Sequence, residues 1–135
     1  MIRIPEALAA ASIMAPASVA ASTATTTEYL DAAGASQVAF LITAAPLGAG
    51  KSLTVTLMAA DDGERSNAQE LGTATFTDAE GTDPQTAVVS YEVSALNGRY
   101  LAVKFQHDAA AAVICSAVAL ADQIYRPAGG WTLVV

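Results

Sequence analysis

The chain has 135 residues, of which 53% are hydrophobic and only 14% are charged, and its formal net charge is −7. Its single cysteine and single histidine exclude an internal disulfide and any metal site built from several Cys or His ligands. Its six basic residues form no cluster, which argues against binding to a nucleic-acid backbone. Because a soluble domain usually carries roughly a quarter charged residues, we expect other subunits to cover part of this surface.

Residues 1–26 are rich in Ala, Ser and Thr, and we expect them to form an N-terminal arm that lies on a partner subunit. A short helix is allowed over Ala7–Ala15. The alternative is a secretory signal with Arg3 in its basic region and Ser18–Ala20 as its cleavage site, but Glu6 and the low leucine content do not fit such a signal. The segment is also too short and too polar at its ends to span a membrane.

Two strands follow, over Gln37–Ala45 and Ser52–Ala59. Apolar and polar residues alternate in both, and this period of two predicts strands with one buried face. A Pro/Gly turn joins them, and the acidic turn Asp61–Gly63 ends the second. The residues expected to face the core are Val38, Phe40 and Ile42 in the first strand and Leu53, Val55 and Leu57 in the second.

Four more strands are predicted, at Thr73–Thr77, Thr86–Val93, Arg99–Gln106 and Ala112–Ala121. Turn signals separate them, and Asn97–Gly98 is the strongest. The last strand reads AVICSAVALA, a nearly continuous apolar run that is typical of a strand buried on both faces. The inward residues expected in the strand at 99–106 are Leu101, Val103 and Phe105.

Turn signals roughly every 8 to 15 residues, without a long amphipathic helix, predict an all-β fold. We expect a jelly-roll-like β-sandwich of about eight strands with an extended N-terminal arm. An immunoglobulin-like sandwich is the alternative, although the Cys…Trp…Cys pattern is missing. The predicted organisation is the arm at 1–26, the β-sandwich domain at 27–127, and a C-terminal strand or arm at 128–135.

The segment Ala45–Ser52 (APLGAGKS) contains part of a phosphate-binding loop. Its Gly-Lys-Ser end matches the pattern G-x-x-x-x-G-K-[ST], but alanine replaces the first glycine. The motif also needs a following helix whose N-terminus faces the phosphate. Because Leu53–Leu57 alternates as a strand instead, we interpret the segment as a hairpin loop.

Seven of the thirteen acidic residues fall between positions 61 and 83. Loop carboxylates of this kind can bind a divalent ion such as calcium, but the pattern D-x-[DN]-x-[DN]-G is absent. Adjacent carboxylates on one turn cannot flank a substrate as a glycosidase pair does. We therefore interpret them as solvated turns, with ion binding as the alternative. They are Asp61, Asp62, Glu64, Glu70, Asp78, Glu80 and Asp83.

The remaining candidates for chemistry are His107–Asp108 and Cys115. No nucleophile elbow of the form G-x-S-x-G accompanies the histidine, so we expect a loop histidine rather than a member of a catalytic triad. Cys115 lies inside an apolar strand without a basic neighbour, and we expect a small core residue rather than a reactive thiol. The sequence thus predicts no catalytic residue, no metal site and no cofactor.

Four segments taken together resemble a known group of proteins. They are Glu28–Gly34 (EYLDAAG), Leu53–Gly63 (LTVTLMAADDG), Arg99–Val103 (RYLAV) and Ser116–Leu120 (SAVAL). In this order they are similar to the small β-sandwich proteins encoded beside the major capsid gene of tailed bacteriophages. Several of that group act as head decoration, or cement, proteins, some with a jelly-roll fold. The resemblance covers residues 27–127.

The resemblance implies a structural virion protein on the outer surface of the capsid rather than an enzyme. Its partner would be the phage major capsid protein, and it would form a homo-oligomer, a dimer or trimer, without binding nucleic acid or membrane. A carbohydrate- or receptor-binding β-sandwich module of a virion or cell surface is the alternative.

The chain ends are expected to do most of the clamping, because an extended arm can pair with a neighbour's sheet edge. Trp and Arg near the C-terminus are typical interface anchors, although plain core packing of the tryptophan is the alternative. The residues expected to contact the partner are Ile2, Ile4, Leu8, Ile13, Met14, Tyr125, Arg126 and Trp131.

Overall fold

The structure is a computed structural model, and it describes residues 9–32, 35–61, 68–93 and 99–122. These residues form β-strands and no helix, so the predicted all-β class is confirmed. The strands are β1 (Ala9–Val19), β2 (Thr25–Thr26), β3 (Leu30–Asp31), β4 (Gln37–Ala44), β5 (Lys51–Ala60), β6 (Gln69–Asp78), β7 (Gln85–Glu92), β8 (Tyr100–His107) and β9 (Val113–Ala121).

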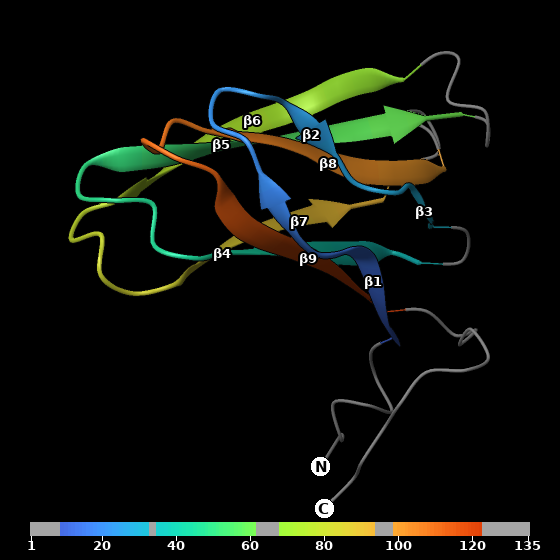
Figure 1. Cartoon of the computed structure of the whole chain (residues 1–135). Coiled ribbons are helices and arrows are strands. Elements are labelled where there is room, and N and C mark those ends of the chain that lie inside the picture. Colours follow the sequence, from blue (N-terminus) through green and yellow to red (C-terminus); the bar gives the residue numbers. More distant parts are fainter. Residues whose placement is uncertain (1–8, 33–34, 62–67, 94–98, 123–135) are drawn as a thin grey trace, which may run out of the picture.

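Two antiparallel sheets stack face to face (Figure 1). Sheet A has the strand order β1-β9-β4-β7. Sheet B has the order β2-β8-β5-β6, with β3 also paired to β8. β2 and β3 pair with opposite ends of β8, whose other side is taken by β5, so together they act as one interrupted strand.

This pairing pattern is that of a jelly roll. When β2 and β3 count as one strand, the first strand pairs with the last, the second with the second-last, and so on inward to the β5·β6 hairpin. The long nested hairpin is then closed into two sheets by the pairs β9·β4 and β8·β5. The expected jelly-roll-like sandwich is therefore confirmed.

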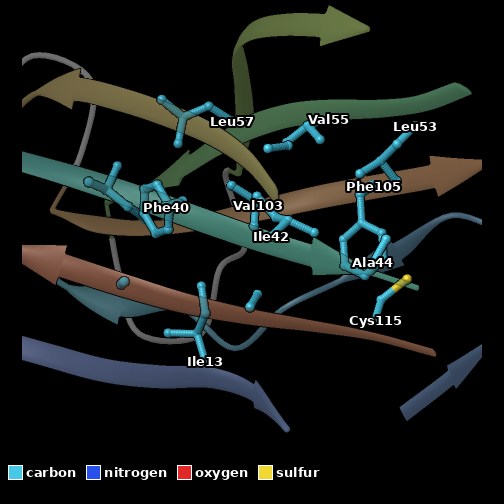
Figure 2. Packing of buried hydrophobic residues seen from close by; sticks show 14 of the residues in the cluster. Ile13, Phe40, Ile42, Ala44, Leu53, Val55, Leu57, Val103, Phe105 and Cys115 are labelled. Atoms are coloured by element: carbon cyan, nitrogen blue, oxygen red, sulfur yellow. The ribbon is translucent and has the colours of Figure 1, made fainter. Parts of the chain in front are cut away.

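Apolar side chains from the inner faces of both sheets form one core (Figure 2). The inward faces expected for the strands at 37–45, 52–59 and 99–106 are confirmed, because each of their nine predicted residues is 5% exposed or less. Burying an aliphatic or phenyl side chain of this size contributes about 1.5–3 kcal/mol. The alternation of apolar residues therefore decides which face of each strand packs inward.

β1 is the main departure from the sequence analysis. The helix allowed over residues 7–15 is wrong where the structure describes it, because Ala9–Val19 pairs with β9 as an edge strand. Alanine favours helix intrinsically, but sheet pairing overrides so weak a preference. Two register shifts interrupt the ladder, and Pro16 lies at the second, where a residue without an N–H is tolerated.

The described part of the expected arm, residues 9–26, thus belongs to the two sheets. The remaining parts of the expected arms, residues 1–8 and 128–135, lie outside the described residues.

Candidate interaction surface

The outer face of sheet B is polar, and its side chains pair with one another. Hydroxyl groups on β5 face hydroxyl groups on β6, and Lys104 Nζ of β8 lies 2.7 Å from Glu70 Oε1 of β6. A hollow of about 250 Å³ over β5 and β8 is lined in part by Ser52, Thr54, Thr56 and Lys104. The hydroxyl pairs are Ser52–Thr77 at 3.1 Å, Thr54–Thr75 at 3.4 Å and Thr56–Thr73 at 3.1 Å.

The outer face of sheet A has an aliphatic central row, flanked by Leu, Ala, Ser and Thr residues. Opposed residues of antiparallel strands point to the same side of a sheet, so the register defines the rows of this face. The four strands of sheet A contain a single charged residue, Glu92. Each row of this face takes one residue from β9, one from β4 and one from β7, in that order. The central row is Val118, Leu41 and Val88. The row on one side of it is Leu120, Ala39 and Ser90, and the row on the other side is Ser116, Thr43 and Thr86.

Exposure confirms that this face is open to solvent. Val88 is 55% exposed and Ile114 is 59% exposed, and they are the two exposed large hydrophobic residues in the described part of the chain. An antiparallel sheet that faces water usually alternates apolar-in and polar-out, and sheet B follows that rule. Because sheet A does not, its outer face has the composition of a surface that contacts another protein.

One end of this face carries a polar rim. The carboxylate of Asp122, just after β9, accepts hydrogen bonds from the backbone N–H groups of Ser36 (2.9 Å) and Gln37 (2.8 Å) and from the Ser36 hydroxyl. The hydroxyl bond, followed by the Gln37 bond, lowers the pKa of Asp122 below its ordinary value. A hollow of about 370 Å³ lies beside this rim, lined in part by Ala39 and Leu120. An apolar centre with a polar border is typical of protein interfaces.

The phosphate-loop-like segment at 45–52 forms the connection between β4 and β5. Lys51 begins β5, so a strand and not a helix follows the Gly-Lys-Ser run. The backbone N–H of Gly50 donates to the carbonyl of Asp78 (2.8 Å), which ties the turn to the end of β6. The expected hairpin is wrong, because β4 belongs to sheet A and β5 to sheet B, so the segment is a loop that crosses from one sheet to the other. The strand that follows it offers no helix N-terminus to face a phosphate.

Asp78 also joins two loops through its side chain. Its Oδ2 accepts the backbone N–H of Leu47 (3.0 Å), and its Oδ1 accepts that of Gly81 (2.9 Å). Gly81 has a φ of +74°, and a Cβ at this position would lie 2.3 Å from the backbone N of Ala49. These contacts, which we call the Asp78 clasp, hold the β4–β5 and β6–β7 connections against each other.

The acidic residues between 61 and 83 do not form a cluster in the described residues. In that part of the chain, no group of three or more His, Cys, Asp or Glu side chains is placed to hold a metal ion. Glu70 pairs with Lys104, and Asp78 is only 2% exposed, so the expectation of a solvated turn is wrong for Asp78. Asp62 and Glu64 lie outside the described residues.

His107 was expected in a loop, but it is the buried last residue of β8, with 1% of its surface exposed. Its Nδ1 accepts the backbone N–H of Ala109 (3.2 Å), so the ring proton lies on Nε2, which donates to the carbonyl of Val19 (2.8 Å). The next residue, Asp108, accepts the backbone N–H of Ser52 (2.7 Å). Both side chains therefore fasten strand ends to neighbouring segments.

Cys115 is 1% exposed, which confirms the expected core position. Burial raises the pKa of its thiol and keeps it protonated. A protonated, buried thiol is a poor nucleophile.

Of the eight residues expected to contact a partner, the structure describes only Ile13 and Met14. Ile13 is 4% exposed and lies in the core, so its side chain is not available to a partner. Met14 is half-buried and packs against the core. Outside the described residues lie Ile2, Ile4, Leu8, Tyr125, Arg126 and Trp131.

Sequence reasoning missed the outer face of sheet A, although a signal for it exists. The run AVICSAVALA predicts a strand buried on both faces. Its inward residues are buried, but Ile114 on the outer side is 59% exposed, so within this chain the expectation is wrong. A central strand that is apolar on both faces and open on one indicates a face that a partner could cover.

Neither a model of a known protein family nor a curated protein matches this sequence. Among the described residues, no helix is long and apolar enough to cross a membrane. The fold and its outer faces are therefore the basis for a functional proposal.

Proposed function

We propose that this chain is a structural protein of a tailed-phage virion, which binds the outer surface of the capsid and clamps neighbouring major capsid proteins. The observation that carries the proposal is the outer face of sheet A, whose rows are aliphatic or small and uncharged. The sequence resemblance to head decoration proteins supplies the class of partner.

The shape of this face supports contact with a protein surface rather than with a small molecule. Small-molecule sites are concave and converge a few polar groups on the ligand. Here the central row Val118, Leu41 and Val88 spans three adjacent strands, and the charged groups stay at the rim. Such a face gains affinity by removing apolar area from water, at about 25 cal/mol per Å².

A cement function does not need a very tight single contact. A standard interface buries about 1,600 Å² in total, and one such joint repeated over a shell acts multivalently. The rigid core supports this role because a preformed face loses little conformational freedom on binding. The Asp78 clasp and the His107 hydrogen bonds keep the two sheets in a fixed arrangement.

The structure changes which residues we propose as partner contacts. Ile13 is replaced by residues of the outer face of sheet A, led by the exposed Val88 and Ile114 and the half-buried Leu41. A contribution from residues 1–8 and 128–135 stays a prediction.

The test compares virions of the phage that encodes this chain with virions from which its gene has been deleted. Both are heated stepwise or diluted rapidly out of high salt, and the DNA released is measured. We expect the deletion particles to release DNA at a lower temperature, and purified protein added back should restore retention. Equal DNA retention by the two kinds of particle contradicts the proposal.

The alternative of a carbohydrate-binding module makes a different prediction. Sugar sites usually present exposed aromatic rings, and the described outer face of sheet A carries none. If the purified protein bound glycans on an array and was absent from the capsid, that module would replace the cement protein as the conclusion.

A further inference from the structure

The edges of the two sheets differ in how well they can pair with another strand. β1 carries Pro16 and two register shifts, and β2 and β3 are only two residues long each. β6 has a register shift opposite Leu57 and Met58. Proline, bulges and short strands are the usual devices that prevent edge-to-edge pairing. Three of the four edges are therefore protected.

β7 has none of these devices. Its eight residues, QTAVVSYE, pair with β4 in one continuous register from Gln85↔Ala44 to Glu92↔Gln37. It contains no proline or glycine, and its only charge is at its last residue. Among the described residues, β7 pairs with β4 alone. A long, regular and uncharged edge of this kind is a template for a further strand.

The hydrogen-bonding direction of this edge can be derived. The backbone N–H of Val93 donates to the carbonyl of Ser36 in the segment before β4 (2.9 Å). In an antiparallel ladder, residues alternate between bonding to one side and to the other. Odd-numbered residues of β7 therefore bond to β4, and Thr86, Val88 and Ser90 direct their N–H and C=O groups to the open edge.

We infer that β7 pairs antiparallel with β7 of a second copy of this chain, about a two-fold axis at Val88. This register places Val88 opposite the second copy's Val88, and Thr86 opposite its Ser90. Each pair lies on the same side of the joined sheet, as an antiparallel ladder requires. No like charges oppose each other, because the segment from Gln85 to Ser90 is uncharged.

The apolar row favours a second copy over an unrelated strand. The central row Val118, Leu41 and Val88 ends at the open edge of β7, and Val88 at this edge is the most exposed of the three residues. Across the two-fold axis, this row meets the same row of the second copy, whose residues follow in the reverse order, from Val88 to Leu41 to Val118. The dimer then has one eight-stranded sheet and a doubled outer face. This inference does not rest on the proposed function, because it concerns the purified protein without capsid.

The first test measures the mass of the purified protein by light scattering or sedimentation from about 1 to 100 µM. We expect a dimer of twice the 13.6 kDa chain mass. Val88→Lys should raise the dissociation constant at least about tenfold, because it places two like charges directly opposite each other. The control is Ile114→Lys, an equally exposed residue of the same face on β9, which should leave the dimer intact.

The second test fixes the register by cross-linking with a short bismaleimide. Val88→Cys should cross-link, because the two Cα atoms would lie about 5.5 Å apart. Ser90→Cys should not cross-link to itself, because the two copies would be four residues, or about 13 Å, out of register. The native Cys115 is buried and serves as the background control.

A monomer at every concentration overturns the inference. So does a dimer that tolerates Val88→Lys but is lost in Ile114→Lys, which would place the contact on the sheet face. Cross-linking of Ser90→Cys as efficient as that of Val88→Cys would overturn the two-fold at Val88. None of these results decides whether the protein binds a capsid.

Discussion

The outer faces of the two sheets are made by the same fold but have opposite chemistry. On sheet B, outward hydroxyls pair across β5 and β6, and the one cation among them is paired with Glu70. On sheet A, outward positions are aliphatic or small, and Ile114 and Val88 are more than half exposed. The core requires only that the inward faces be apolar, so stability does not explain this difference. For this reason the outer face of sheet A is the one that we propose for contact with a partner.

Both outer faces belong to one rigid body only if the Asp78 clasp holds the loops between the two sheets together. Substitution of Gly81 in this clasp should have the largest effect on stability. Gly81→Ala should lower the free energy of unfolding by about 3 kcal/mol or more, because the residue has a positive φ and its Cβ would collide with the backbone of Ala49. Gly72→Ala is the matched control, since a Cβ there meets nothing within 4 Å. It should leave stability unchanged or raise it by up to about 1 kcal/mol. Urea denaturation measures both, and equal effects would contradict the role of the Asp78 clasp.

A lysine introduced on each outer face should show which of the two faces binds the particle. Leu41 lies in the central row of sheet A. Leu41→Lys should weaken binding to particles that lack this protein by about 30-fold, or about 2 kcal/mol. Thr54→Lys is also half-buried but lies on the outer face of sheet B, and should bind as the wild type does. Sedimentation with the particles measures both. A larger loss for Thr54→Lys would move the contact to sheet B.

The hydroxyl pairs should differ in strength between the faces. A double-mutant cycle with Thr56→Val and Thr73→Val on sheet B should give a coupling of up to about 1 kcal/mol. The matched pair on sheet A is Thr43 and Thr86, which are both exposed. Their hydroxyl oxygens lie 3.4 Å apart, whereas those of Thr56 and Thr73 lie 3.1 Å apart. Their cycle should give a smaller coupling. The prediction fails if the sheet A pair couples more strongly in urea unfolding.

The smallest effect is expected at the rim of sheet A. Because hydrogen bonds from Ser36 and Gln37 lower the pKa of Asp122 in the folded state, its contribution to stability is present above its ordinary pKa of about 3.8. That contribution is lost as the pH falls through the lowered folded-state pKa. Wild type should therefore be more stable than Asp122→Asn near neutral pH, with the difference shrinking in acid. Thermal unfolding over a pH series measures this, and a difference independent of pH would contradict it.

Much of the sandwich could be predicted from local pattern. The inward positions of β4, β5 and β8 follow from alternation alone, and Phe40 and Phe105 are buried as expected. β1 could not be predicted because its alanine-rich sequence has no alternation, and only its partner β9 makes it a strand. The roles of Asp78 and His107 depend on backbone groups far away in the sequence, so no local pattern reveals them.

The outer face of sheet A was partly visible in the sequence. The continuous apolar run of β9 predicted two buried faces, and the structure shows that this chain buries one of them. What the run could not reveal is which strands lie beside it. Leu41 and Val88 join the same surface only because β4 pairs with β9 on one side and with β7 on the other.

The nested pairing also has a consequence for biosynthesis. β9 lies inside sheet A between β1 and β4, yet it is the last described strand to leave the ribosome. Until it emerges, β1 has no described neighbour to pair with and β4 has only β7, so sheet A cannot close. Distant pairings of this kind also make folding slow. The aliphatic surface is therefore completed only after synthesis of the domain, and a prematurely terminated chain cannot display it.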